Sequence, residues 1–118
     1  MSLTPTTAQP AIPRGAEVDL ELFTFVERYA TTNFRLDLIL LFGRKPDTAL
    51  TAQQVASELR RSLLATTKEL DDLTYLQLLV RHYTPEETTY RLSRRANIRE
   101  VTVRLAALDS KTLPAIVA

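Results

Sequence analysis

Residues 51–73 read TAQQVASELRRSLLATTKELDDL, and this stretch decides the fold. It opens in the form of a capping box, in which the Thr51 hydroxyl bonds the backbone amide of Gln54 and the Gln54 side chain reaches back. A helix therefore starts here. Its apolar positions fall on one face, which comprises Val55, Ala56 and Leu59.

Residues 60–62 form a short break, and Ser62 is placed to cap a second helix over about residues 63–76. The inward positions of that helix are Thr66, Leu70 and Leu73. The stretch thus predicts two short helices joined by a tight turn.

Two further helices are predicted before this pair. Apolar residues recur with a helical period over residues 18–29. Residues 31–33 then offer N-caps for a nearly unbroken apolar run that ends at Phe42, which predicts a central helix buried nearly all round. Gly43 fits a C-cap, and residues 44–47 turn the chain.

A β-hairpin and a last helix are predicted after the pair. Residues 78–83 and 89–93 have strand character and flank a polar, proline-containing connection. Beyond them, a helix over residues 95–110 carries an apolar stripe made of Ile98, Val101, Leu105 and Leu108.

Composition sets the class of protein. The chain has 118 residues, 45% of them hydrophobic, and no cysteine, which predicts one globular domain over residues 17–118 after a disordered tail of residues 1–16. Disulfides and thiolate metal sites are excluded, and a cytoplasmic location is expected. The longest apolar run, residues 38–42, is far short of the ~18 residues that span a bilayer, so no membrane association is expected.

The order of elements resembles the winged helix-turn-helix of bacterial transcriptional regulators. The resemblance covers roughly residues 33–93 and rests on residues 50–59, Ser62, residues 70–73, residues 78–80 and residues 90–93. In this family a small residue, here Ala56, lets the two helices of the motif pack closely. More narrowly, the chain looks like small bacterial winged-helix proteins labelled as regulators.

The resemblance implies a mainly α fold with a small β-hairpin: a helix-turn-helix over residues 51–76, a wing over residues 78–93, and additional N-terminal and C-terminal helices. One position departs from the family pattern. Gln77 stands where the family commonly has glycine at the helix exit, and a left-handed backbone there costs about 1 kcal/mol.

The function implied by the resemblance is that of a DNA-binding transcriptional regulator whose partner is double-stranded DNA. The second helix of the motif would enter the major groove while the wing lies beside it. The candidate contacts are Arg60, Arg61, Ser62, Leu64, Ala65, Lys68, Arg81 and Arg91.

The charges on this face also support a different interpretation. Asp71 and Asp72 oppose phosphate binding, and Glu86 and Glu87 place the wrong sign at the tip of the wing. A module that binds a protein partner instead would use a second set of residues, namely Leu64, Asp71, Asp72 and Tyr75. A third interpretation is that the first or the last helix covers Leu64 and Tyr75.

The C-terminal region carries an excess of basic residues, namely Arg91, Arg94, Arg95, Arg99, Arg104 and Lys111. Arginines that flank the apolar stripe would either contact phosphate or keep the helix soluble. The stripe itself, Ile98, Val101, Leu105 and Leu108, either packs on its own domain or forms a homodimer.

Catalysis is not expected. His82 is the only histidine, and the chain has two glycines, too few for a phosphate-cradling loop. The carboxylate pairs are adjacent in sequence rather than positioned across a site. We therefore expect no enzymatic activity, no metal and no cofactor.

Overall fold

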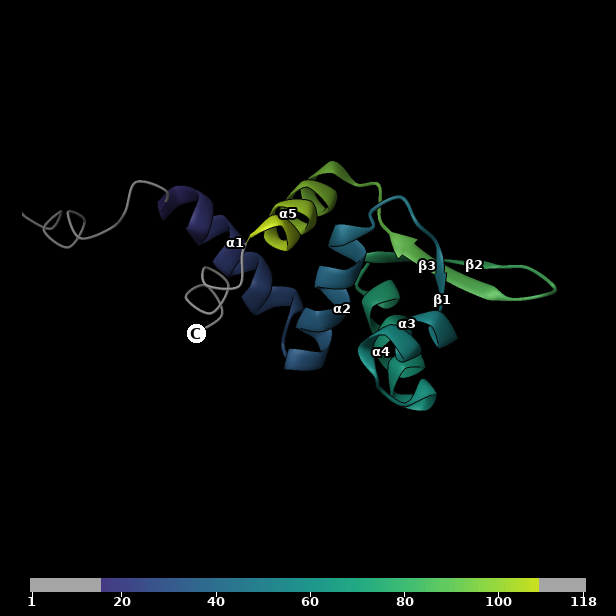
Figure 1. Ribbon diagram of the computed structural model, residues 1–118. Coiled ribbons are helices and arrows are strands. Elements are labelled where there is room, and N and C mark those ends of the chain that lie inside the picture. Colours follow the sequence, from purple (N-terminus) through teal and green to yellow (C-terminus); the bar gives the residue numbers. More distant parts are fainter. Residues whose placement is uncertain (1–15, 109–118) are drawn as a thin grey trace, which may run out of the picture.

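The computed structural model describes residues 16–108. Within them the chain forms a mainly helical fold with a small antiparallel sheet (Figure 1). The elements are α1 (Ala16–Tyr29), α2 (Asn33–Arg44), β1 (Leu50–Thr51), α3 (Ala52–Leu59), α4 (Leu63–Tyr75), β2 (Leu79–Tyr83), β3 (Thr88–Leu92) and α5 (Ala96–Ala107). In Figure 1, α1 and α5 lie at one end of the molecule, and the β2–β3 hairpin projects from the other.

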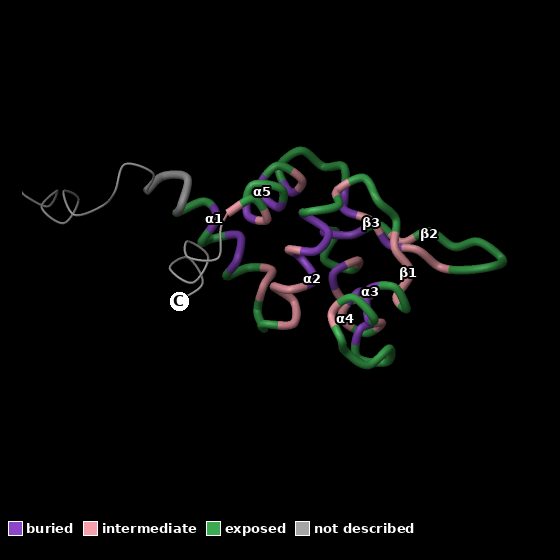
Figure 2. The backbone as a smooth tube through the Cα atoms, viewed as in Figure 1, coloured by how far each residue is buried: buried purple, intermediate pink, exposed green. Residues whose placement is uncertain are grey.

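Helix α2 is the centre of the core. It begins after Thr32, whose side chain accepts a hydrogen bond from the Arg35 amide. Leu38, Ile39 and Phe42 are completely buried, and α2 contacts α1, α3, α5 and β3. Figure 2 shows this central helix largely in the buried and intermediate colours. The prediction that α2 is covered nearly all round is confirmed.

Gly43 does not cap α2, so that prediction is wrong. The helix continues through Gly43 to Arg44, and Lys45 is the C-cap. Gly43 is instead the point of closest packing against α5. A Cβ at this position would lie 2.6 Å from the Thr102 carbonyl oxygen and 2.7 Å from the Ala106 Cβ. The absence of a side chain therefore lets α5 lie against α2.

The helix pair α3–α4 forms as the sequence predicts. Both hydrogen bonds of the capping box between Thr51 and Gln54 are present. The Ser62 hydroxyl accepts a hydrogen bond from the Ala65 amide and caps α4. Arg60 closes α3 in the left-handed conformation, with φ 57°. The predicted inward residues of α4 are all buried, namely Thr66, Leu70 and Leu73.

The sheet has one strand more than the sequence predicts. The hairpin is confirmed, and β3 lies between β1 and β2 in the order β1-β3-β2. Strand β1 pairs Leu50 with Tyr90 and Thr51 with Thr89. A strand of two residues has no alternation of apolar and polar positions, so no sequence pattern could reveal it. Gln77 adopts φ 68°, as expected at the exit of α4.

Helix α5 packs on its own chain. Ile98, Val101 and Leu105 are buried in the common core, and Leu108 packs against that core. Of the two interpretations of this stripe, the structure matches packing within the domain, and these side chains are not available to a second copy. The helix ends at Ala107, and the rest of the segment predicted to reach residue 110 lies outside the described residues.

At the other end, α1 already begins at Ala16, the last residue of the predicted tail, and residues 1–15 lie outside the described part. No helix within residues 16–108 has both the length and the apolar character needed to span a bilayer.

The first prediction concerns Gly43. Gly43→Ala should destabilise the fold by about 2 kcal/mol, because overpacking the α2–α5 contact outweighs the ~1 kcal/mol that alanine gains in a helix. Urea denaturation monitored by circular dichroism measures the effect. Ser57→Ala, at an exposed position of α3, is the control and should change stability little. A Gly43→Ala variant as stable as the parent would contradict the close packing.

The second prediction compares two buried threonines. The Thr66 hydroxyl has no hydrogen-bond partner among the described residues, whereas the Thr102 hydroxyl donates to the Ile98 carbonyl at 2.7 Å. Thr66→Val should therefore raise the free energy of unfolding by about 1 kcal/mol, and Thr102→Val should lower it by about 1 kcal/mol. Thermal unfolding of both variants tests this contrast, and equal effects would refute it.

Candidate nucleic-acid interface

The outer face of α4 is open to solvent along its whole length. Leu64 near its start is 84% exposed and Tyr75 at its end is 86% exposed. Neither α1 nor α5 covers these side chains, so the third interpretation of this face is wrong. Lys68 lies between them on the same face and is also exposed. Helix α4 thus offers a continuous surface to a partner.

One edge of this face is bound to α2 by ion pairs. The Arg35 guanidinium donates to Glu69 at 2.6 Å and to Asp72 at 3.0 Å. Lys68 donates to the same Asp72 carboxylate at 2.8 Å. The hydrogen bond from Lys68 is the main reason that the pKa of Asp72 is lowered, and the same bond raises the pKa of Lys68.

The other edge is bound to the hairpin through Asp71. Its Oδ1 accepts hydrogen bonds from Arg81 at 2.7 Å and from the Tyr90 hydroxyl at 2.8 Å. Burial, followed by the bond to Asp71, raises the pKa of Tyr90 to about 12. The bond to Asp71 also raises the pKa of Arg81, whose guanidinium lies 5.1 Å from the centre of the Tyr83 ring. These contacts hold β2 and β3 in place beside α4.

The cations at the start of α4 are arranged differently. Arg60 and Arg61 are exposed, and neither forms an ion pair with any described residue. The Arg61 guanidinium lies 4.5 Å from the centre of the Phe34 ring, which orients it without neutralising it. The surface around the first turn of α4 therefore retains positive charge.

The structure brings most of the candidate DNA contacts together, but not all of them. Residues 60–68 lie just before and within the first turns of α4. The Ser62 hydroxyl is already used as the N-cap of this helix. Arg81 faces α4 and is bound to Asp71. Arg91 alternates with the buried Tyr90 and Leu92, so its side chain lies on the face of the sheet opposite to that of Arg81.

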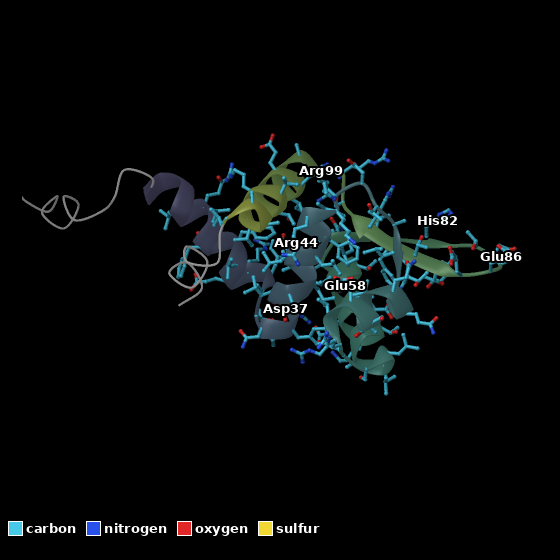
Figure 3. All side chains as sticks on the ribbon, in the orientation of Figure 1. Asp37, Arg44, Glu58, His82, Glu86 and Arg99 are labelled. Carbon is cyan, nitrogen blue, oxygen red and sulfur yellow. The ribbon has the colours of Figure 1, made fainter. Side chains whose placement is uncertain are left out.

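Other charged residues lie away from this face. Arg99 pairs with Asp47, and Arg104 pairs with Glu21 of α1, so these two arginines of the C-terminal cluster stabilise the packing of α5. Lys111 lies outside the described residues. Figure 3 shows His82 and Glu86 on the hairpin, directed away from the helices. Residues 16–108 contain no group of three or more acidic or histidine side chains placed to hold a metal ion.

Three residues of the site are not indicated by the sequence pattern, namely Arg35, Glu69 and Tyr90. Each takes part in a contact between elements that are distant along the chain, and no local pattern marks such a contact. The helical period does place Glu69 beside Ala65 and Asp72 on one flank of α4, which is the only signal that could have indicated it.

No protein-family model matches the sequence, and a search of the curated proteins finds no similar chain. The assignment of function therefore depends on the geometry and charge of this face.

The third prediction concerns the pH dependence of stability. Because the pKa of Asp72 is lowered in the folded state, its ion pairs stabilise the fold above the ordinary carboxyl pKa of about 3.9, and this contribution is lost as the pH falls through the folded value. Asp72→Asn should therefore be less stable than the parent at pH 7, and the difference should shrink below pH ~4.

Urea denaturation at a series of pH values measures this difference. Glu58→Gln serves as the control, because Glu58 is exposed and forms no ion pair with a described residue. A difference for Asp72→Asn that is the same at pH 3 and pH 7 would show that the carboxylate charge is not what stabilises α4.

Proposed function

We propose that this protein is a DNA-binding regulator of the winged helix-turn-helix type, without catalytic activity. Helices α3 and α4 are its helix-turn-helix, and the β2–β3 hairpin is its wing. The observation that carries the proposal is the uncovered face of α4 with Arg60 and Arg61 unpaired beside its first turn. Helix-turn-helix proteins place the first turns of the second helix against base edges.

The charge of α4 supports this proposal better than the sequence alone suggests. Asp71 and Asp72 would repel phosphates if they were unpaired, but Arg81, Arg35 and Lys68 all lie within 3.0 Å of one or the other. Their negative charge is therefore offset within the domain. The unpaired Arg60 and Arg61 then supply positive charge at the start of α4, while Glu86 and Glu87 keep negative charge at the tip of the hairpin.

The roles of the remaining residues follow from their positions. Arg60 and Arg61 bind phosphates on the rim of the groove, because their guanidinium groups are exposed on a turn rather than on the helix itself. Leu64 and Ala65 lie on the first two turns of α4 and contact thymine methyl groups. Arg81 positions the hairpin through Asp71 and does not read sequence.

A second candidate function is supported by the two apolar side chains on the same face. Leu64 and Tyr75 are among the most exposed large apolar residues that the structure describes, and charge-flanked apolar groups are common where proteins bind proteins. In that case Leu64 and Tyr75, flanked by Asp71 and Asp72, would contact a protein partner. A parent protein that fails to bind a mixed-sequence duplex at ~50 mM salt would favour this function.

The fourth prediction tests the phosphate contacts. Arg60→Gln combined with Arg61→Gln should weaken binding to a labelled duplex and reduce the slope of log K against log salt by about 0.9 for each lost contact. Fluorescence anisotropy between ~50 and ~200 mM salt measures both quantities.

The control is Arg28→Gln, which removes a charge from the last turn of α1, outside the α3–α4 pair. Its salt slope should equal that of the parent. If Arg28→Gln lost as much affinity and salt slope per charge as the Arg60 and Arg61 variant, overall charge rather than the first turn of α4 would determine binding.

A further inference from the structure

The hairpin has an unpaired edge. The hydrogen bonds from the Ser93 amide to the Leu78 carbonyl and from the Thr84 amide to the Glu87 carbonyl mark bonded residue pairs at its two ends. Bonded and non-bonded pairs alternate along an antiparallel ladder. With the observed register, the backbone N–H and C=O groups of three β2 residues point away from β3. These residues are Leu79, Arg81 and Tyr83.

Nothing in residues 16–108 satisfies these groups. The sheet order places β2 at its edge, and no other described segment forms a backbone hydrogen bond to this side of β2. A groove of about 460 Å³ runs along the edge, from Tyr83 to Gln77 and Arg95 at the base of the hairpin. Along this edge Tyr83 is exposed and Arg81 half-buried, whereas Leu79 lines the base of the groove with 2% of its surface exposed. An open strand edge is a template for a further strand.

We propose that this edge pairs with β2 of a second copy of the chain, in antiparallel orientation about a two-fold axis at Arg81. The outward residues are symmetric about Arg81, so Leu79 of each copy lies opposite Tyr83 of the other. The outward groups of Arg81 then meet across the axis, and those of Tyr83 reach Leu79 at the base of the groove in the other copy. The interface is isologous and closes after two copies.

The charges of the hairpin complement each other in this arrangement. Glu86 and Glu87 lie beyond Tyr83 at the tip, and Figure 3 shows Glu86 at the free end of the hairpin. Antiparallel pairing places this acidic tip beside the base of the hairpin in the second copy, where Arg95 lines the groove. The same contact occurs twice, once at each end of the paired strands.

The distribution of charge also explains why the occupant is a second copy. An acidic peptide would match Arg95 but would meet Glu86 and Glu87 at the other end, whereas the inverted hairpin matches both ends. The two Arg81 side chains that meet at the axis are each neutralised by Asp71 of their own chain at 2.7 Å. Tyr83, which is 66% exposed, becomes partly covered.

Charge reversal at each end of the hairpin tests the pairing. Sedimentation velocity of the full chain should show a concentration-dependent dimer. Glu86→Arg with Glu87→Arg should be monomeric, and so should Arg94→Glu with Arg95→Glu, because each variant places like charges at both contacts. An equimolar mixture of the two variants should restore the dimer. The proposal would be overturned by a parent that is monomeric at ~0.5 mM or by either charge-reversal variant forming a dimer alone. It would also be overturned if the mixture of the two variants stayed monomeric.

A backbone variant tests the strand pairing itself. Tyr83→Pro removes an outward N–H without removing a hairpin hydrogen bond, and proline is tolerated on strand edges. It should reduce dimerisation at least ten-fold. Tyr83→Ala is the matched control and should keep most of the dimer. Circular dichroism verifies that each variant is folded. If Tyr83→Pro unfolds, the mixture of charge-reversal variants remains the test of the pairing. A folded Tyr83→Pro variant that dimerises like the parent would contradict the pairing.

Discussion

The burial of α2 is the constraint on which the rest of the structure depends. Leu38, Ile39 and Phe42 have no exposed surface, so other elements must surround this helix. Helices α1, α3 and α5 and strand β3 all contact it, and Gly43 allows the closest of these approaches. Helix α4 packs mainly on α3 and β2. Its outer face therefore remains available for a partner while its inner face completes the core.

Ion pairs join α4 to its neighbours at both edges of its outer face, beside the buried contacts of its inner face. Arg35 binds one edge to α2, and Asp71 binds the other to the hairpin through Arg81 and Tyr90. These contacts use charges that would otherwise be free to meet a ligand. They leave the exposed arginines at the start of α4 without an ion-pair partner among the described residues. Pairing within the domain thus separates the charged residues that hold α4 in place from those that the proposed function assigns to DNA.

Much of the fold could be predicted from the sequence, because caps and apolar periods are local signals. The capping box at Thr51, the cap at Ser62 and the left-handed Gln77 all occur where the sequence predicts them. The expectation that Gly43 ends α2 is wrong because glycine permits both a helix end and a close helix contact, and only the position of α5 distinguishes the two. The site was less predictable, since the partners of Asp71 and Asp72 are long-range contacts. Whether this face binds DNA stays a prediction.

The most direct test of the proposed function is to follow backbone amide chemical shifts by NMR while a mixed-sequence duplex is added at low salt. We expect the largest changes over residues 60–68, smaller changes along the hairpin, and none in α1 or α5, which lie at the opposite end of the molecule. Shifts centred on α1 and α5, or no shifts at all, would contradict the assignment of the α4 face as a DNA-binding surface.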